Sequence, residues 1–192
     1  ISMGIAILIG VALGAIAGYF GGLADMLLQR VIEIMMTIPT FFLIVTVVAF
    51  YPGGGIWLIM VIIGLTSWPG VARFTRAEFL KVRNMDYVTA AEALGFSSTR
   101  TIFRHVLPNA IAPVLVISAF GIASAILTES ALSFLGFGSA STVSWGSILS
   151  VARGATYAWW MAVFPGTAIF ITVTVYNLLG EGLRDALDPR LK

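Results

Sequence analysis

Residues 1–24 read ISMGIAILIGVALGAIAGYFGGLA and contain no charged side chain. The hydrocarbon core of a bilayer is about 30 Å thick, and about 20 residues of helix cross it at 1.5 Å each. Glycine recurs along the whole stretch and no basic residues precede it, which favours a true span over a signal peptide. The stretch therefore predicts a membrane-spanning helix from approximately Ser2 to Phe20.

The rest of the chain has the same character. Its 192 residues are 59% hydrophobic and only 10% charged, with a mean hydropathy of +1.00, whereas a soluble domain carries roughly a quarter charged residues. A net charge of +2 provides no broad basic surface for nucleic acid. The chain has no cysteine, which excludes disulfides, thiolate metal sites and cysteine nucleophiles. The lipid bilayer is the expected partner.

Four further charge-poor stretches are long enough to cross a membrane. A turn around Tyr51 to Gly55 separates two of them, and the segment Gly136 to Ala158, rich in Gly, Ser and Thr, is expected to be a loop or a short re-entrant helix. The sequence thus predicts an all-α, polytopic helical bundle with five visible spans. The expected further spans are Ile34 to Phe50, Ile56 to Ala72, Asn109 to Phe134 and Trp159 to Leu179.

Basic residues indicate the orientation of the bundle. Short cytoplasmic loops are enriched in Lys and Arg, and six of the eleven basic residues lie in one connecting segment. We therefore expect this segment, Arg73 to Pro108, to be cytoplasmic. Only Arg153 then remains on the outer side. The six residues are Arg73, Arg76, Lys81, Arg83, Arg100 and Arg104.

The cytoplasmic segment contains the pattern of two short helices. Asp86 is a suitable N-cap for the first helix and Gly95 a suitable stop after it. Small and apolar side chains recur at i, i+3, i+4 and i+7 between them, which predicts a stripe that a partner's groove can accept. The stripe consists of Tyr87, Ala90, Ala91 and Leu94.

The second helix is expected to start at Ser97 or Ser98 and to run to Leu107 and Pro108. Proline favours a turn of the chain at this point, back toward the membrane. The segment is thus predicted to be a helix, a glycine bend and a second helix.

These residues resemble a known signature. DYVTAAEALG at residues 86–95 and RHVLPN at residues 104–109 are similar to the EAA loop of ABC-importer permeases. Two positions depart from the family pattern, because Thr89 replaces its glutamate and His105 its isoleucine. LSFLGFG at residues 132–138, SWG at 144–146 and GLRDALDPR at 182–190 extend the resemblance over essentially the whole chain.

The resemblance is to the second ("C") permease subunit of dipeptide, oligopeptide and related nickel importers. It implies that residues 1–192 form a single transmembrane domain of a type I ABC importer, with a further span before Ile1. The implied partners are a second permease subunit, two ATPase subunits and an extracytoplasmic binding protein in the inner membrane of a bacterium or archaeon. No catalytic group, metal or cofactor is implied for this chain.

The same resemblance makes the loop of residues 73–108 a coupling element that docks in the ATPase subunit. The candidate docking residues are Tyr87, Ala90, Ala91, Leu94, Gly95, Leu107 and Pro108.

Glu129 is a further candidate, because an unpaired carboxylate within a span is costly. It either bonds neighbouring helices or lines the translocation path. The repeat of Gly10, Gly14, Gly18 and Gly22 lets helices approach closely, either within this subunit or at a seam with the second permease.

Other functions remain open as alternatives. A nickel-complex importer of the same family would look alike in sequence. An ion-coupled secondary transporter would also be a charge-poor bundle, although an inverted repeat and more buried charge would be expected. A serine protease built on Ser139 and His105 would need both residues on one side of the membrane, and they are predicted on opposite sides.

Overall fold

The structure is a computed structural model that describes residues 1–51, 53–138, 142–155 and 157–187. All regular structure in these ranges is helical. Three features of the sequence lie outside the described residues: Pro52 of the predicted turn, Ser139 of the protease alternative, and Asp188 to Arg190 of the C-terminal motif.

Four helices of the described chain are long and apolar enough to cross a membrane, which confirms the predicted polytopic bundle. A fifth crossing arises if two helices that meet at a sharp bend count as one span. The four are α1 (Ser2–Phe20), α4 (Gly55–Arg83), the helix Ser98–Phe134 that ends in α7 (Leu107–Phe134), and α9 (Trp160–Leu187).

The predicted span Ile34 to Phe50 is not one continuous helix. It is replaced by α2 (Gly22–Thr37) and α3 (Thr40–Phe50), which are bent by 75° relative to each other. The break lies at Ile38, whose ψ of 122° is extended. Proline at the next position disfavours the helical conformation of Ile38, so α2 has to end before it.

Two predicted spans are confirmed but lie in longer helices, because charge marks the end of the apolar stretch and not the end of the helix. The span predicted for Ile56 to Ala72 continues to Arg83, so the first part of the expected loop is a helical extension. The span predicted for Trp159 to Leu179 likewise continues to Leu187.

The predicted helix end at Leu107 and Pro108 is wrong. The short helix α6 (Ser98–Thr101) continues through a π-helical segment, η1 (Ile102–Val106), directly into α7. Hydrogen bonds in a π turn run from residue i to i−5, which widens the turn. Pro108 follows this wide turn near the start of α7, where its ring and its missing N–H are tolerated.

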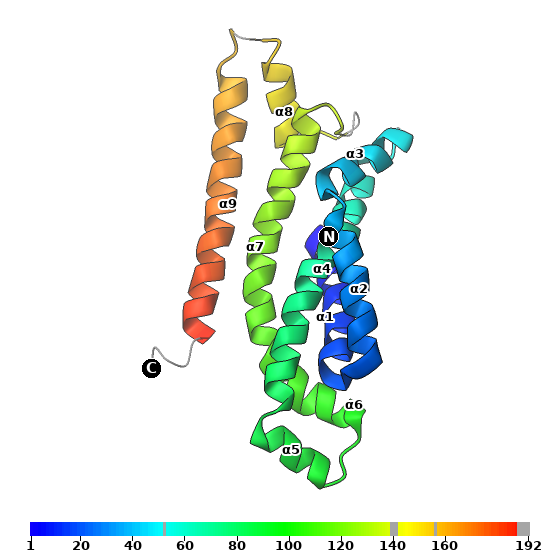
Figure 1. Cartoon of the computed structure of the whole chain (residues 1–192). Coiled ribbons are helices and arrows are strands. Elements are labelled where there is room, and N and C mark those ends of the chain that lie inside the picture. The colour runs from blue at the N-terminus through cyan, green and yellow to red at the C-terminus, as the bar shows by residue number, and fades with distance from the viewer. Residues whose placement is uncertain (52, 139–141, 156, 188–192) are drawn as a thin grey trace.

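The helices are arranged in two groups (Figure 1). α1 lies along α4 with α2 beside them, whereas α7 pairs with α9. The short helices α5 (Asp86–Ala93) and α6 lie at one end of the bundle, at the bottom in Figure 1. At the opposite end lie α3 and α8 (Trp145–Ala152), the short helix within the segment that was predicted not to span.

The glycine repeat of α1 forms the contact with α4. A Cβ atom built on Gly10 or Gly18 would lie 2.6 Å from the Cβ of Val71 or Phe79, and one built on Gly14 would lie 2.5 Å from the carbonyl oxygen of Ala72. These three residues therefore pack within the subunit, one of the two predicted roles. Gly22 is different, because a Cβ there would meet nothing within 4 Å.

Candidate functional site

Helix α5 has a well-defined start and stop. Met85 is its N-cap without a side-chain hydrogen bond, so the predicted capping role of Asp86 is wrong, and Asp86 instead stands in the first turn. At the other end, Gly95 has φ of +79°. Its N–H donates to Glu92 O at 2.9 Å, and the N–H of Phe96 donates to Ala91 O at 3.2 Å. This is a Schellman motif, and it confirms the predicted glycine stop.

The predicted stripe of α5 is divided between two faces. Leu94 is 75% exposed and Tyr87 45% exposed, and Ala90 and Gly95 are also exposed. Ala91, in contrast, is 5% exposed and packs against its own chain. We call the exposed residues Tyr87, Ala90, Leu94 and Gly95 the α5 knob. Of the remaining candidates, Leu107 is half-buried and Pro108 is exposed.

The buried face of α5 rests on the ends of α4 and α7. Val88 is fully buried in an apolar cluster with Phe79 and Val82 of α4, to which Val106 of η1 and Ala110 of α7 also belong. Burial of a valine side chain contributes about 1.5–3 kcal/mol. Because Val88 comes from α5 and the other members come from membrane-crossing helices or their extensions, α5 is attached to the bundle at this cluster.

Polar contacts add a second attachment of α5, to the end of α1. The Tyr19 hydroxyl donates to Glu92 Oε1 at 2.9 Å. The Arg83 guanidinium donates to Tyr19 O at 2.7 Å and to Gly18 O at 3.3 Å, which satisfies carbonyl groups that a helix end leaves free. Sequence reasoning missed these contacts, because partners 64 to 73 residues apart leave no local pattern.

The second helix of the loop starts as predicted. Ser97 is the N-cap of α6, and its Oγ accepts from the Arg100 N–H at 3.4 Å. The Arg100 guanidinium lies 4.1 Å from the centre of the Phe96 ring, and the His105 ring stacks on Phe96 at 5.9 Å. His105 is thus a half-buried member of a stacked group in the loop. In the described part of the chain, no three side chains of the kind that bind metals gather in one place.

A groove opens beside the break between α2 and α3, within the length of α4 and α7 that crosses the membrane. It encloses about 600 Å³, and none of the described residues that line it is charged. Two methionines, Met35 and Met36, contribute to one wall. Hydroxyl side chains from three helices line it, and we call the site that they form the hydroxyl groove. They are Thr40, Thr66, Ser67, Ser124 and Thr128.

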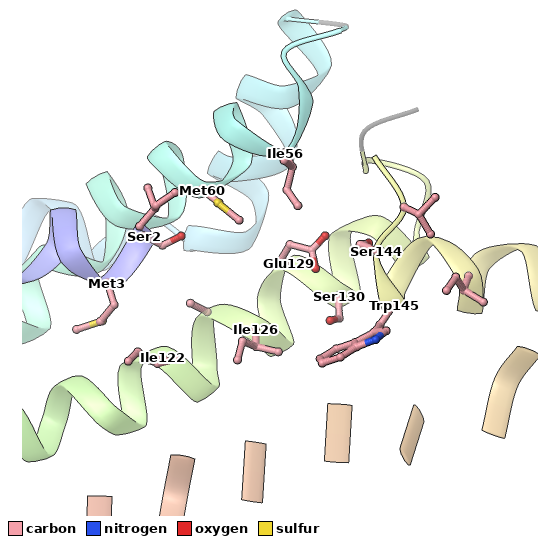
Figure 2. Close-up of a pocket in the computed structure, with 14 residues that line it drawn as sticks. Ser2, Met3, Ile56, Met60, Ile122, Ile126, Glu129, Ser130, Ser144 and Trp145 are labelled. Carbon is pink, nitrogen blue, oxygen red and sulfur yellow. The ribbon is translucent and has the colours of Figure 1, made fainter. Parts of the chain in front are cut away.

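Glu129 lies on α7 near the end of the bundle that holds α8. Its carboxylate points into a second cavity, between Ile56 of α4 and Ser144 at the start of α8 (Figure 2). This cavity encloses about 480 Å³. The Ser133 hydroxyl donates to Glu129 Oε1 at 2.6 Å. Among the described residues no cation pairs with Glu129.

Arg153, the cation predicted on the outer side, is engaged elsewhere. Its guanidinium donates to the carbonyl oxygen of Phe134 at 3.1 Å and to the Ser150 hydroxyl at 2.9 Å. The structure therefore brings Glu129 together with a hydroxyl group and an apolar cavity, and it does not bring Glu129 together with Arg153.

The chain is similar to known proteins over nearly its whole length. Residues 10–192 match the family described as "Binding-protein-dependent transport system inner membrane component". The chain is 38% identical to the dipeptide transport system permease protein DppC of Alkalihalophilus pseudofirmus, in an alignment that covers 97% of this chain and 62% of the relative. It is 37% identical to the oligopeptide transport system permease protein OppC of Bacillus subtilis, over 97% of this chain and 61% of the relative.

A third relative is more similar. The chain is 47% identical to a putative peptide transport system permease protein of Brucella suis, over 94% of this chain and 64% of the relative. The chain thus spans 61% to 64% of the length of these three relatives.

Proposed function

Because this chain belongs to the family of binding-protein-dependent transport system inner membrane components, we propose that it is one of two permease subunits of an ATP-driven peptide importer. The family confirms the predicted resemblance and the predicted inner-membrane location. In the proposed assembly, this subunit forms half of the translocation path. The second permease subunit forms the other half, two ATPase subunits hydrolyse ATP, and an extracytoplasmic binding protein delivers the peptide.

The exposure of the α5 knob is the observation that best supports this proposal. An eight-residue helix at the end of the bundle with the basic residues presents Leu94 and Tyr87 to the surroundings. Apolar area left in water costs roughly 25 cal/mol per Å², so a protein groove that covers these side chains would stabilise the complex. A short amphipathic helix seated in such a groove is a common mode of protein recognition.

The attachment of α5 suggests how force reaches the membrane. Val88 connects α5 to α4 and α7, and Glu92 connects it to α1 through Tyr19. An ATPase subunit that pushes on the α5 knob would therefore move three membrane helices together. Rigid-body movement of this kind can switch a path between inward-open and outward-open states. The subunit needs no catalytic residue of its own for this step.

The names of the relatives favour peptides over nickel complexes as cargo, since they describe dipeptide, oligopeptide and peptide transport. The uncharged hydroxyl groove agrees with a path that tolerates many side chains. An ion-coupled transporter is the alternative, and uptake that persists in the absence of the ATPase subunits would favour it.

The α5 knob can be tested by charge insertion in the intact transporter reconstituted in liposomes. Leu94→Asp places a charge on a side chain that is already exposed, so folding should be preserved while docking is weakened. We expect loss of peptide-stimulated ATP hydrolysis and of uptake. Thr99→Asp, at an exposed position of α6, is the matched control and should retain both. Gly95→Trp adds bulk at the same surface and also strains the helix stop at φ of +79°, so coupling should be lost there too. Undiminished coupling in Leu94→Asp and Gly95→Trp would refute the assignment.

Glu129 is proposed to line the outer part of the path. The carboxylate has a hydroxyl partner but no described cation, which is an unusual state for an acidic residue within a span. Exchange of Glu129 for Gln preserves the hydrogen bond from Ser133 and removes the charge. Normal assembly with loss of uptake would support the path role, and normal uptake would assign the residue to helix packing.

A further inference from the structure

We propose that the hydroxyl groove is the surface on which this subunit binds the backbone of the peptide in transit, through hydrogen bonds that its hydroxyl oxygens accept from peptide N–H groups. This inference rests on the proposed function. It adds a binding site, the chemical group that the site recognises, and the side chains that do so.

Three of the five hydroxyl groups of the groove, those of Thr66, Ser67 and Thr128, already donate to backbone carbonyl groups. Thr66 and Ser67 donate to the carbonyl oxygens of Ile62 and Ile63 at 2.9 and 2.6 Å. Thr128 donates to the carbonyl oxygen of Ser124 at 2.9 Å. A hydroxyl group has one proton to donate but two lone pairs with which to accept. Each of these oxygens therefore presents acceptor capacity, and a peptide backbone supplies the matching N–H donors.

The break between α2 and α3 is an independent reason to expect a polar occupant in the hydroxyl groove. The ends of helices leave backbone N–H and C=O groups without intrahelical partners. Within a membrane, backbone of this kind occurs only where protein covers it or where it lines a water-filled cavity. Ile38, Pro39 and Thr40 form the break and are exposed in this chain, and Thr40 is also part of the groove wall. Water, a peptide or a protein segment is therefore the expected occupant of the groove rather than lipid.

The remaining wall of the groove fits a variable side chain. Met35 and Met36 are flexible and polarizable, so they can adapt to apolar groups of different shape. The described lining residues carry no charge of their own, and the Arg73 guanidinium contacts this wall through Met36 Sδ, to which it donates at 3.4 Å. Recognition of the constant backbone, combined with an adaptable apolar wall, is what a path for peptides of many sequences requires.

The alternative occupant is a helix of the second permease subunit, and cysteine accessibility separates the two. The chain contains no cysteine, so Ser124→Cys introduces a single thiol of nearly the same size. Ser124 lies ten residues from the end of α7 and Phe170 ten residues from the start of α9. Both are thus about 15 Å from the outer ends of their helices. Phe170 is 69% exposed on a different helix, which makes Phe170→Cys the control of matched depth.

The experiment uses the complete transporter with cysteine-free partner subunits, and a water-soluble, membrane-impermeant thiol reagent. We expect the Ser124→Cys thiol to react at least tenfold faster than the Phe170→Cys thiol. Trialanine, added with the binding protein and ATP, should slow the reaction of Ser124→Cys severalfold. It should leave Phe170→Cys unaffected.

A second measurement removes single hydroxyl groups. Thr66→Val keeps the shape of the side chain but loses the acceptor, and we expect the KM for trialanine uptake to rise about threefold to tenfold, as for one lost hydrogen bond. Thr46→Val is the matched control, because Thr46 on α3 makes the same bond to its own helix, to Phe42 O at 2.7 Å, outside the groove. Its KM should not change.

The outcomes separate this inference from the proposed function. Trialanine uptake without labelling of Ser124→Cys would place a protein helix in the groove and overturn the inference alone. Labelling that trialanine does not slow would do the same, because the groove would then be wet but would not contact the peptide. An unsubstituted transporter that takes up no peptide would overturn the proposed cargo and this inference with it.

Discussion

The contact between α1 and α4 allows a sharp test of the packing, by addition of a single methyl group. Gly14→Ala places a Cβ atom 2.5 Å from the carbonyl oxygen of Ala72 and 2.8 Å from the Cβ of Thr75. The nearest of these is a backbone atom that cannot rotate away. Ordinary contact begins near 3.4 Å, so α1 and α4 have to move apart.

This separation sets the expected loss of stability in Gly14→Ala. A gap of about 0.5–1 Å forfeits a quarter to a half of the dispersion energy of each atom pair that it opens, and overpacking of this kind typically costs about 1–3 kcal/mol. Alanine also gains about 1 kcal/mol of helix propensity over glycine. Gly4→Ala on the same helix has the same gain without the clash, since a Cβ at Gly4 meets nothing within 4 Å. The difference between the two variants therefore isolates the clash.

The assay is thermal unfolding of the intact transporter in detergent, followed by the fraction that still elutes as a folded complex. A domain of about this size shifts its midpoint by about 2–4 °C for each kcal/mol, and a larger assembly by less, so the midpoint of Gly14→Ala should lie measurably below that of Gly4→Ala. Equal midpoints would show that α1 and α4 do not approach as closely as the structure has them, and the reasoning would fail.

Three further predictions concern the short helices. Tyr19→Phe removes the hydroxyl that donates to Glu92, so the attachment of α5 to α1 should lose about 1 kcal/mol. Less peptide should then be imported per ATP hydrolysed, and an unchanged ratio would show that this contact does not transmit movement to α1. Gly95→Ala forces an L side chain to a φ of +79°, at a cost of about 1–2 kcal/mol. Amide hydrogen exchange in α5 should therefore accelerate about 5–30-fold, and an unchanged exchange rate would contradict this prediction. Ser144→Ala removes the capping box of α8, so α8 should lose about 1 kcal/mol of stability. Amide hydrogen exchange should become faster in α8 and stay unchanged in α5, and slower or equal exchange in α8 would disprove the capping role.

Hydropathy predicted the existence of the spans well, because a membrane-crossing helix needs only a sufficient length of apolar residues. The first helix was predicted to end at Phe20, where α1 does end. The break within the predicted span Ile34 to Phe50 was missed because a backbone effect overrides hydropathy there. Ile38 is apolar but stands before proline, so it breaks a stretch that hydropathy alone joins.

The candidate site was predictable only in part, for a related reason. Gly95 after a short periodic run announces a helix stop, and this local signal was read correctly. The direction in which α5 faces is not local, because it depends on the cluster around Val88 and on contacts with α1. For this reason Ala90 and Ala91 were expected to share one surface, although Ala91 is buried. The hydroxyl groove was missed because its residues come from three helices and no pattern within one helix marks them.

The uninterrupted helix from Ser98 to Phe134 has a mechanical consequence. Its 37 residues form a beam of about 55 Å, which reaches from beside the α5 knob to the level of Glu129. A beam that pivots near its middle swings its two tips in opposite directions. If the ATPase subunits tilt this beam, its inner tip approaches the axis of the transporter as its outer tip departs, so that one mouth narrows while the other widens. Tilting of this one helix would therefore prevent the inner and outer openings of the path from being open at the same time, without a chain of side-chain contacts between them.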